Sequence, residues 1–105
     1  MIKVFISQPM KDKTEEEILK AREKAIATVK RGYGENVEII DSYFADYNPD
    51  AGCVPLKFLA KSLELLADAD IAYFAKGWQD ARGCRIENVC AKEYGIAIIR
   101  DYTED

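Results

Sequence analysis

At 105 residues the chain can build one hydrophobic core and little more, so we expect a single domain over residues 1–105. With 49% hydrophobic and 32% charged residues it has a globular composition, and no apolar run approaches the roughly 20 residues that span a bilayer. A net charge of −4 argues against a nucleic acid polymer as partner, and the absence of histidine excludes imidazole catalysis and most transition-metal sites.

The first half of the chain predicts a strand, a helix and a second strand. Residues 3–7 form a compact apolar run that ends before Pro9, as expected of a strand. Thr14 and Glu17 have the spacing of a capping box, and Ile18 opens an apolar pattern at helical spacing that continues to the glycines near residue 34. Residues 37–40 then read as a second short strand.

A second helix follows a loop rich in Asn, Pro, Asp and Gly. Pro55 suits the start of a helix. The apolar stripe of this helix comprises Leu59, Leu63, Leu66 and Ala67, and it stops at Asp68.

The remaining segments repeat the alternation. Residues 71–75 are the third strand, residues 83–94 the third helix and residues 96–99 the last strand. The order βαβαβαβ, with continuously apolar strands, predicts a small doubly wound α/β domain of the flavodoxin-like or Rossmann-like kind. Its four-stranded parallel sheet should be covered by helices on both faces.

The cysteines and the N-terminus indicate the compartment. Cys53, Cys84 and Cys90 are odd in number and lack the paired spacing of zinc or redox motifs, so we expect reduced thiols and no metal site. The N-terminal apolar run is too short for a signal-peptide core, and we therefore expect a cytoplasmic protein. The chain also lacks the glycine-rich fingerprints of dinucleotide and phosphate-loop proteins, and we expect no cofactor.

Ligands of open α/β sheets bind beyond the carboxyl ends of the strands, where the strand order reverses. Polar segments reach this edge after each of the first three predicted strands. They carry Ser7, Gln8 and Met10 after the first strand, Asp41 after the second, and Gly77, Trp78, Asp80 and Gly83 after the third. We expect these segments to converge on one pocket.

The sharpest candidate in this pocket is Glu87. Helical side chains lean toward the N-terminus, so its carboxylate should lie over Gly83, which leaves room for a ligand. The nearby helix N-terminus should favour the ionised form. Glu87 and Asp80 could divide nucleophilic, acid-base and hydroxyl-binding roles at a glycosidic centre; the alternative is two solvated acids at a helix start.

Three further features each allow two interpretations. The ring of Trp78 either stacks on a nucleobase or covers an edge of the core or an interface. Ser7 and Gln8 precede a helix N-terminus, where an anion can bind, but they lack a recognised phosphate motif. Arg85 is either part of a phosphate clamp or a surface group.

Cys84 lies next to the predicted site, but the chain has no histidine to activate a thiol nucleophile.

The chain resembles the nucleoside 2-deoxyribosyltransferase superfamily, and most closely its short nucleoside deoxyribosyltransferase-like members. The resemblance covers nearly the whole chain. It is carried by residues 3–10 (KVFISQPM), residues 62–71 (SLELLADADI), and the Gly77-Trp78 pair with the GCRIE segment of residues 83–87. It implies cleavage or transfer of the N-glycosidic bond of a deoxynucleoside or its 5′-monophosphate.

The same resemblance implies roles for individual residues. Glu87 would attack C1′ of the sugar and form a deoxyribosyl-enzyme ester, and Ser7 with its neighbours would contact the 5′-phosphate. Two positions depart from the enzyme pattern: Ser62 stands where an aspartate is common, and Arg85 where a small residue is usual. Arg85 would either narrow the pocket or pair with Glu87 and weaken it as a nucleophile.

Other functions and partners remain open. Ser62 and Arg85 are also compatible with a module that binds a nucleotide or an ADP-ribose-like ligand without turnover, and the pocket loops could instead form a protein interface. The resemblance further implies a homodimer or higher homo-oligomer. Tyr43, Phe44 and Tyr47 are candidates for its contact face.

Overall fold

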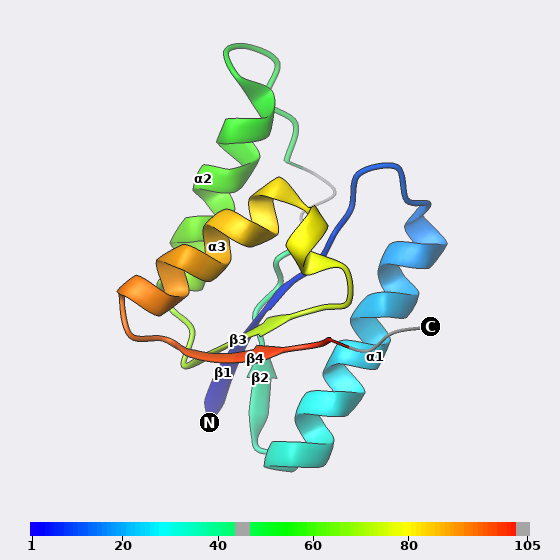
Figure 1. Cartoon of the computed structure of the whole chain (residues 1–105), viewed down its shortest axis with the longest axis vertical. Helices are drawn as coiled ribbons and strands as arrows, with labels where there is room; N and C mark the ends of the chain where they lie inside the picture. The colour runs from blue at the N-terminus through cyan, green and yellow to red at the C-terminus, as the bar shows by residue number, and fades with distance from the viewer. Residues whose placement is uncertain (44–46, 103–105) are drawn as a thin grey trace.

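A computed structural model describes residues 1–43 and 47–102 and confirms the predicted α/β architecture. Its elements are β1 (Ile2–Ser7), α1 (Glu15–Tyr33), β2 (Val37–Ile39), α2 (Val54–Leu66), β3 (Ile71–Phe74), the 3₁₀ helix η1 (Trp78–Asp80), α3 (Arg82–Glu93) and β4 (Ala97–Arg100). Only η1 was not predicted, and it occupies the polar segment between the third strand and the third helix (Figure 1).

The four strands form one sheet in the order β2-β1-β3-β4, and every neighbouring pair is parallel. From β1 the chain passes outward to β2 on one side, whereas from β3 it passes to β4 on the other side. The carboxyl ends of β1 and β3 are therefore the point where the strand order reverses. Ser7 ends β1 directly beside Phe74, the last residue of β3.

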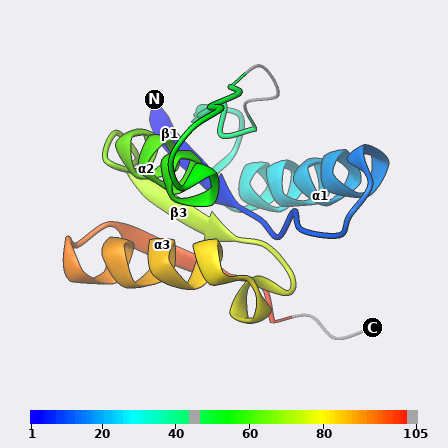
Figure 2. The ribbon, with the colours of Figure 1, turned by 90° about the horizontal axis from the view of Figure 1, so that it is seen from above.

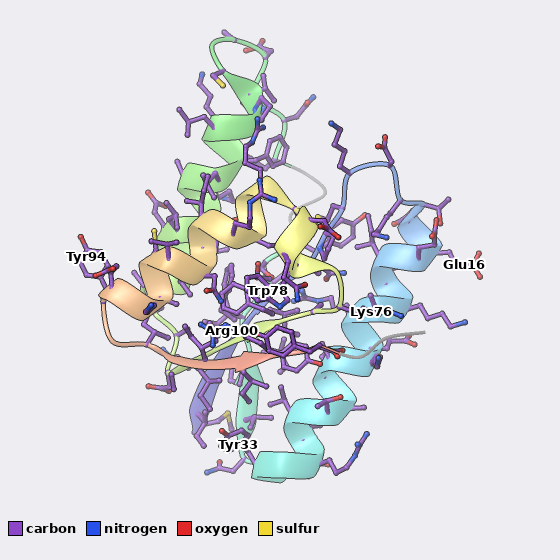
Figure 3. The ribbon with its side chains drawn as sticks, in the orientation of Figure 1. Glu16, Tyr33, Lys76, Trp78, Tyr94 and Arg100 are labelled. Carbon is purple, nitrogen blue, oxygen red and sulfur yellow. The ribbon has the colours of Figure 1, made fainter. Side chains whose placement is uncertain are left out.

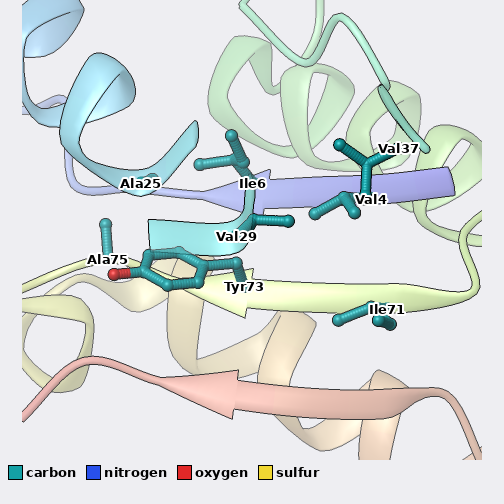
Figure 4. Packing of buried hydrophobic residues seen from close by; sticks show 8 residues of the cluster. All are labelled: Val4, Ile6, Ala25, Val29, Val37, Ile71, Tyr73 and Ala75. Carbon is teal, nitrogen blue, oxygen red and sulfur yellow. The ribbon is translucent and has the colours of Figure 1, made fainter. Parts of the chain in front are cut away.

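Helices cover both faces of the sheet, as a doubly wound fold requires. Helix α1 lies on one face, and α2 and α3 lie on the other (Figures 1 and 2). The cluster under α1 consists of Val4, Ile6, Ala25, Val29, Val37, Ile71, Tyr73 and Ala75 (Figure 4). The opposite cluster consists of Phe5, Leu66, Ala72, Phe74, Trp78, Cys84 and Ala91. Successive strand residues point to opposite faces, which explains why the two central strands carry consecutive buried apolar residues, Val4 to Ile6 in β1 and Ile71 to Phe74 in β3.

The start of α1 confirms the capping box. The amide of Glu17 donates to the Thr14 hydroxyl at 3.1 Å, and the amide of Thr14 donates to the Glu17 carboxylate at 3.0 Å. Two amides that would otherwise lack partners are satisfied in this way. The loop between β1 and α1 therefore ends at a fixed residue.

Helix α2 matches its predicted stripe only in part. Of its 13 residues, Leu66 alone is fully buried, and Ala67 at its C-terminal end is exposed. The remaining apolar side chains are half-buried or exposed because the N-terminal turns extend beyond the carboxyl end of the sheet (Figure 1). Among the helices described, none has the length and apolar character needed to cross a bilayer.

Candidate active site

A cleft of about 1190 Å³ opens over the carboxyl ends of β1 and β3. Its walls are the loop after β1, the N-terminal half of α2, and the segment that runs from Gly77 into α3. Of the residues predicted for the site, the cleft brings together Ser7, Gln8, Met10, Ser62, Gly77, Asp80, Gly83, Arg85 and Glu87. Segments that are distant in sequence therefore meet at one cavity.

Two predicted residues lie elsewhere. Asp41 is exposed, accepts a bond from the amide of Tyr43 at 3.3 Å, and does not line the cleft. Trp78 is 9% exposed and belongs to the core, where its ring lies 5.7 Å from that of Phe74 and 5.8 Å from the Arg100 guanidinium (Figure 3). The placement of Trp78 favours a role in covering the core over one in stacking on a ligand.

Glu87 of α3 lines the cleft. Its side chain is only 6% exposed, and its Oε1 accepts a hydrogen bond from the Ser7 hydroxyl at 2.7 Å. This is an ordinary distance for a hydrogen bond between two oxygens. The end of β1 thus holds the carboxyl group that α3 presents.

Burial controls the charge of this carboxyl group. Desolvation raises the pKa of Glu87 to about 7, while the hydroxyl groups of Ser7 and Ser62 act in the opposite direction. The predicted effect of the N-terminus of α3, to favour the ionised form, fades beyond the first turn, and Glu87 is the sixth residue of the helix. Desolvation is the largest effect on this carboxyl group, and the pKa is raised.

Cys84 lies beside this pair but is not a second nucleophile. Burial is the main reason that the pKa of its thiol is raised to about 11; the hydrogen bond with Ser7 lowers the pKa, and the neighbouring Glu87 adds a smaller raise. A thiol with this pKa is protonated at neutral pH. Glu87 is therefore the group in this cluster that can ionise near neutrality.

Gln8 supports the loop after β1. Its Nε2 donates to the carbonyl of Ile18 in α1 at 2.8 Å, which engages one of the two N–H groups of the amide. Its Oε1 is buried and has no hydrogen-bond partner within the described residues. The second N–H group leaves the predicted contact of Gln8 with a phosphate open.

Two glycines shape the wall opposite the loop. Gly77 has a φ of 85°, the left-handed region, and a Cβ there would lie 3.5 Å from the ring of Pro9. Gly83 has ordinary helical geometry, and a Cβ there would meet no atom within 4 Å. The space above Gly83 is therefore open, and the side chain of Glu87, which was predicted to lie over Gly83, has no atom within 4 Å of this position.

Arg85 does not pair with Glu87. Its Nη1 donates to the backbone carbonyl of Gln79 at 2.9 Å, and its side chain is exposed at the edge of the cleft. No cationic group contributes to the shifted pKa of Glu87. Of the two alternatives predicted for Arg85, narrowing the cleft remains open, whereas an ion pair that suppresses the nucleophile is not formed.

The apolar wall that α2 supplies to the cleft is not among the features predicted from the sequence. Val54, Leu56, Phe58 and Leu59 line the cleft opposite α3. Leu59 belongs to the apolar stripe, which by pattern cannot be distinguished from a core-facing stripe. Only the extension of α2 beyond the sheet shows that its first turns face a cavity.

The described residues contain no group of three Cys, Asp or Glu side chains placed to hold a metal ion. Comparison of the chain with protein-family models, with curated proteins and with solved structures gave no match.

Replacement of Glu87 by glutamine should change how stability depends on pH. A folded pKa of about 7, raised from 4.5, means that the native state binds more protons between these values, so wild-type stability falls as pH rises through this window. Glu87→Gln keeps an acceptor for Ser7 and removes the charge. We expect it to be more stable than wild type by up to about 3 kcal/mol near pH 8 and equally stable near pH 4.

Urea denaturation of both proteins across this range measures the effect. The matched control is Glu93→Gln, which changes an exposed glutamate of the same helix and should leave the pH dependence of wild type intact. A constant stability difference between Glu87→Gln and wild type at all pH values would contradict a raised pKa.

Proposed function

We propose that the protein cleaves or transfers the N-glycosidic bond of a deoxynucleoside or its 5′-monophosphate, with Glu87 as the nucleophile. The observation that carries the proposal is the buried carboxyl group of Glu87, bonded to Ser7 at 2.7 Å and facing a cleft at the switch point of the sheet. The resemblance to the nucleoside 2-deoxyribosyltransferase superfamily supports the same assignment through the segments that supply both residues.

The proposed step is a displacement at C1′ of the sugar. An oxygen of ionised Glu87 forms a bond to C1′ while the bond from C1′ to the base nitrogen breaks. The base leaves with the electron pair of the broken bond and takes up a proton. Water or a second base then attacks C1′ and gives up a proton, while the bond from C1′ to the Glu87 oxygen breaks and Glu87 is released as a carboxylate.

Other residues of the cleft suit the remaining parts of the substrate. Asp80 lines the cleft and is exposed, so its carboxylate can accept a hydrogen bond from a sugar hydroxyl or contact the departing base. Lys11 and Lys13, in the loop after β1, also line the cleft, and their ammonium groups can bind a 5′-phosphate. These lysines would add to the predicted contact by Gln8, which has engaged one of its two amide N–H groups, whereas the Ser7 hydroxyl already donates to Glu87.

Removal of the carboxylate should abolish the reaction. Wild type, Glu87→Gln and the control Glu93→Gln are incubated with deoxynucleosides and their 5′-monophosphates, and released base is followed by chromatography. We expect Glu87→Gln to lose at least about 10³-fold in rate, because no ester can form through an amide. The wild-type rate should rise with pH to a plateau, with a midpoint of about 7, as the carboxyl group ionises.

Equal rates for wild type and Glu87→Gln would exclude Glu87 as the nucleophile. Absence of base release from every substrate would exclude the glycosidic reaction for these substrates.

The open space beside Glu87 gives a separate prediction. Gly83→Ala meets no atom in the protein and replaces a helical glycine, so its stability should rise by up to about 1 kcal/mol. Its methyl group projects into the space that the substrate needs, so we expect kcat/KM to fall at least about tenfold. Gly32→Ala in α1 is the matched control, since a Cβ there also meets no atom and Gly32 lies outside the cleft. Unchanged activity in Gly83→Ala would show that substrate does not occupy this space.

A second candidate function is binding of a nucleotide or an ADP-ribose-like ligand without turnover. Ser62 favours it, because a hydroxyl group cannot replace the carboxylic acid that assists a departing base. Protonation of about half of Glu87 at neutral pH also lessens the repulsion of an anionic ligand.

Calorimetry against a panel of nucleotides and ADP-ribose separates the two functions. The binding module predicts that ligand is recovered intact, and that Glu87→Gln binds anions at least as tightly as wild type, because the variant removes a negative charge from the cleft. Turnover of the bound ligand would reject the module. Failure of wild type to bind any member of the panel would reject both candidates.

A further inference from the structure

Among the residues that the structure describes, Glu87 has no neighbour suited to protonate a departing base. The groups that act on its carboxyl group are the hydroxyls of Ser7 and Ser62, and the thiol of Cys84 lies next to Ser7. Burial raises the pKa of that thiol to about 11, and a hydroxyl group is a weaker acid still. Asp80 also lines the cleft, where its exposed carboxylate can accept a proton but has none to give.

A neutral base cannot leave easily from these surroundings. When the bond from C1′ to a neutral base breaks, the base takes the electron pair and becomes an anion unless an acid protonates it. That negative charge would develop beside Glu87 with no guanidinium to offset it, because Arg85 donates to the carbonyl of Gln79. A base that already carries a positive charge avoids this difficulty, since it leaves as a neutral molecule.

The lining of the cleft also suits a cationic aromatic ring. Tyr43 and Phe58 supply aromatic side chains to it, beside the apolar wall of α2. The face of an aromatic ring attracts a cation within about 6 Å of its centre, and an apolar wall gives a flat ring contact area. Of the other aromatic residues that the sequence suggested for a contact face, Tyr47 packs edge-on against Phe58 with ring centres 5.0 Å apart, and Phe44 lies outside the described residues.

We propose that the substrate is a deoxynucleoside, or its 5′-monophosphate, whose base carries a fixed positive charge, as a pyridinium ring or an N-alkylated purine does. This inference rests on the proposed function and names the class of substrate for the same site. The carboxylates of Glu87 and Asp80 both line the cleft that would receive the charged ring. Cleavage removes the charge, so the attraction that holds the substrate is lost when the neutral base forms.

The first step needs no acid for such a substrate. An oxygen of ionised Glu87 bonds to C1′ while the bond from C1′ to the ring nitrogen breaks, and the electron pair of that bond neutralises the ring. Water then attacks C1′ and gives a proton to the exposed carboxylate of Asp80, which passes it to solvent. The bond from C1′ to the Glu87 oxygen breaks in this second step, and Glu87 is released as a carboxylate.

The charge of the base should also act on Glu87. With a pKa of about 7, this carboxyl group is about half protonated at neutral pH, and a cation bound beside it lowers the pKa and drives it to the ionised form. Binding of a cationic ligand near pH 7 should therefore release up to about half a proton per site. An uncharged ligand of the same shape should release none.

The first test compares 1-methylnicotinamide with nicotinamide, which differ by one methyl group that fixes a positive charge on the ring. We expect calorimetry at pH 8 to show at least about tenfold tighter binding of the cation by wild type. Glu87→Gln should lose this preference, whereas the matched control Glu93→Gln, an exposed position of the same helix, should keep it. Titrations at pH 7 in two buffers of different ionisation enthalpy measure the released proton. Equal affinity of wild type for the two molecules would overturn the inference.

The second test measures base release from nicotinamide 2′-deoxyriboside 5′-monophosphate and from the common deoxynucleoside 5′-monophosphates. Each rate is divided by the rate without protein, which removes the intrinsic reactivity of the substrate. We expect the acceleration to be at least about tenfold greater for the pyridinium substrate. Ser62→Asp supplies an acid beside Glu87 and should raise the rate on neutral bases at least about tenfold without raising the rate on the pyridinium substrate. Ser62→Asn, similar in size but without an acidic proton, should raise neither.

The outcomes separate this inference from the proposed function. Equal acceleration of neutral and pyridinium substrates would overturn the inference and leave the proposed function in place. Release of base from none of these substrates would reject the proposed function and the inference with it. A folded Ser62→Asp, checked by circular dichroism, that gains no activity on neutral bases would overturn the role given to the missing acid. The comparisons made with wild type do not require this variant to fold.

Discussion

The hydrogen bond between Ser7 and Glu87 joins residues that are 80 positions apart, and the geometry of the cleft depends on it. The two residues meet because β1 pairs with β3, which sets Ser7 beside Phe74, and because η1 turns the chain back so that α3 begins over the same edge. A sheet in which β1 and β3 were not neighbours would separate the hydroxyl from the carboxyl group. The site is therefore a product of strand order as much as of residue type.

Among the residues that the structure describes, Glu87 has no cationic partner, and this determines how its reactivity is set. An arginine at bonding distance would lower the pKa of the carboxyl group and keep it ionised, but Arg85 donates to the carbonyl of Gln79 instead. Burial raises the pKa, and the hydroxyl groups of Ser7 and Ser62 limit the rise. A pKa of about 7 leaves both protonation states populated at neutral pH, which suits a group that must lose and regain charge during a reaction. Above that pH the folded protein contains a buried charge, which destabilises it. The packing of the apolar clusters on the two faces of the sheet must offset this loss of stability.

The sequence predicts the architecture because local patterns and the final packing agree. The capping box at Thr14 and the four apolar runs locate their elements to within a residue or two. The cleft is also predictable in outline, since the carboxyl ends of parallel strands share one edge. The raised pKa of Glu87 and the location of Trp78 in the core are not predictable from the sequence. Each depends on how deeply neighbouring segments bury the side chain. The stripe of α2 shows the same limit: its spacing indicates an apolar face but not whether that face meets the core, a cavity or another molecule.

Helix α2 connects the cleft to the surface of the molecule. Most helical stability in proteins comes from packing of an apolar face, yet α2 buries only Leu66 completely. Its first turns extend past the sheet, where Leu56, Phe58 and Leu59 line the cleft and Ala60 is exposed. A ligand in the cleft would supply packing to these turns. The free energy of ordering them would then be part of the free energy of binding. The marginal packing of α2 is therefore the feature through which occupancy of the cleft would change the stability of the helix.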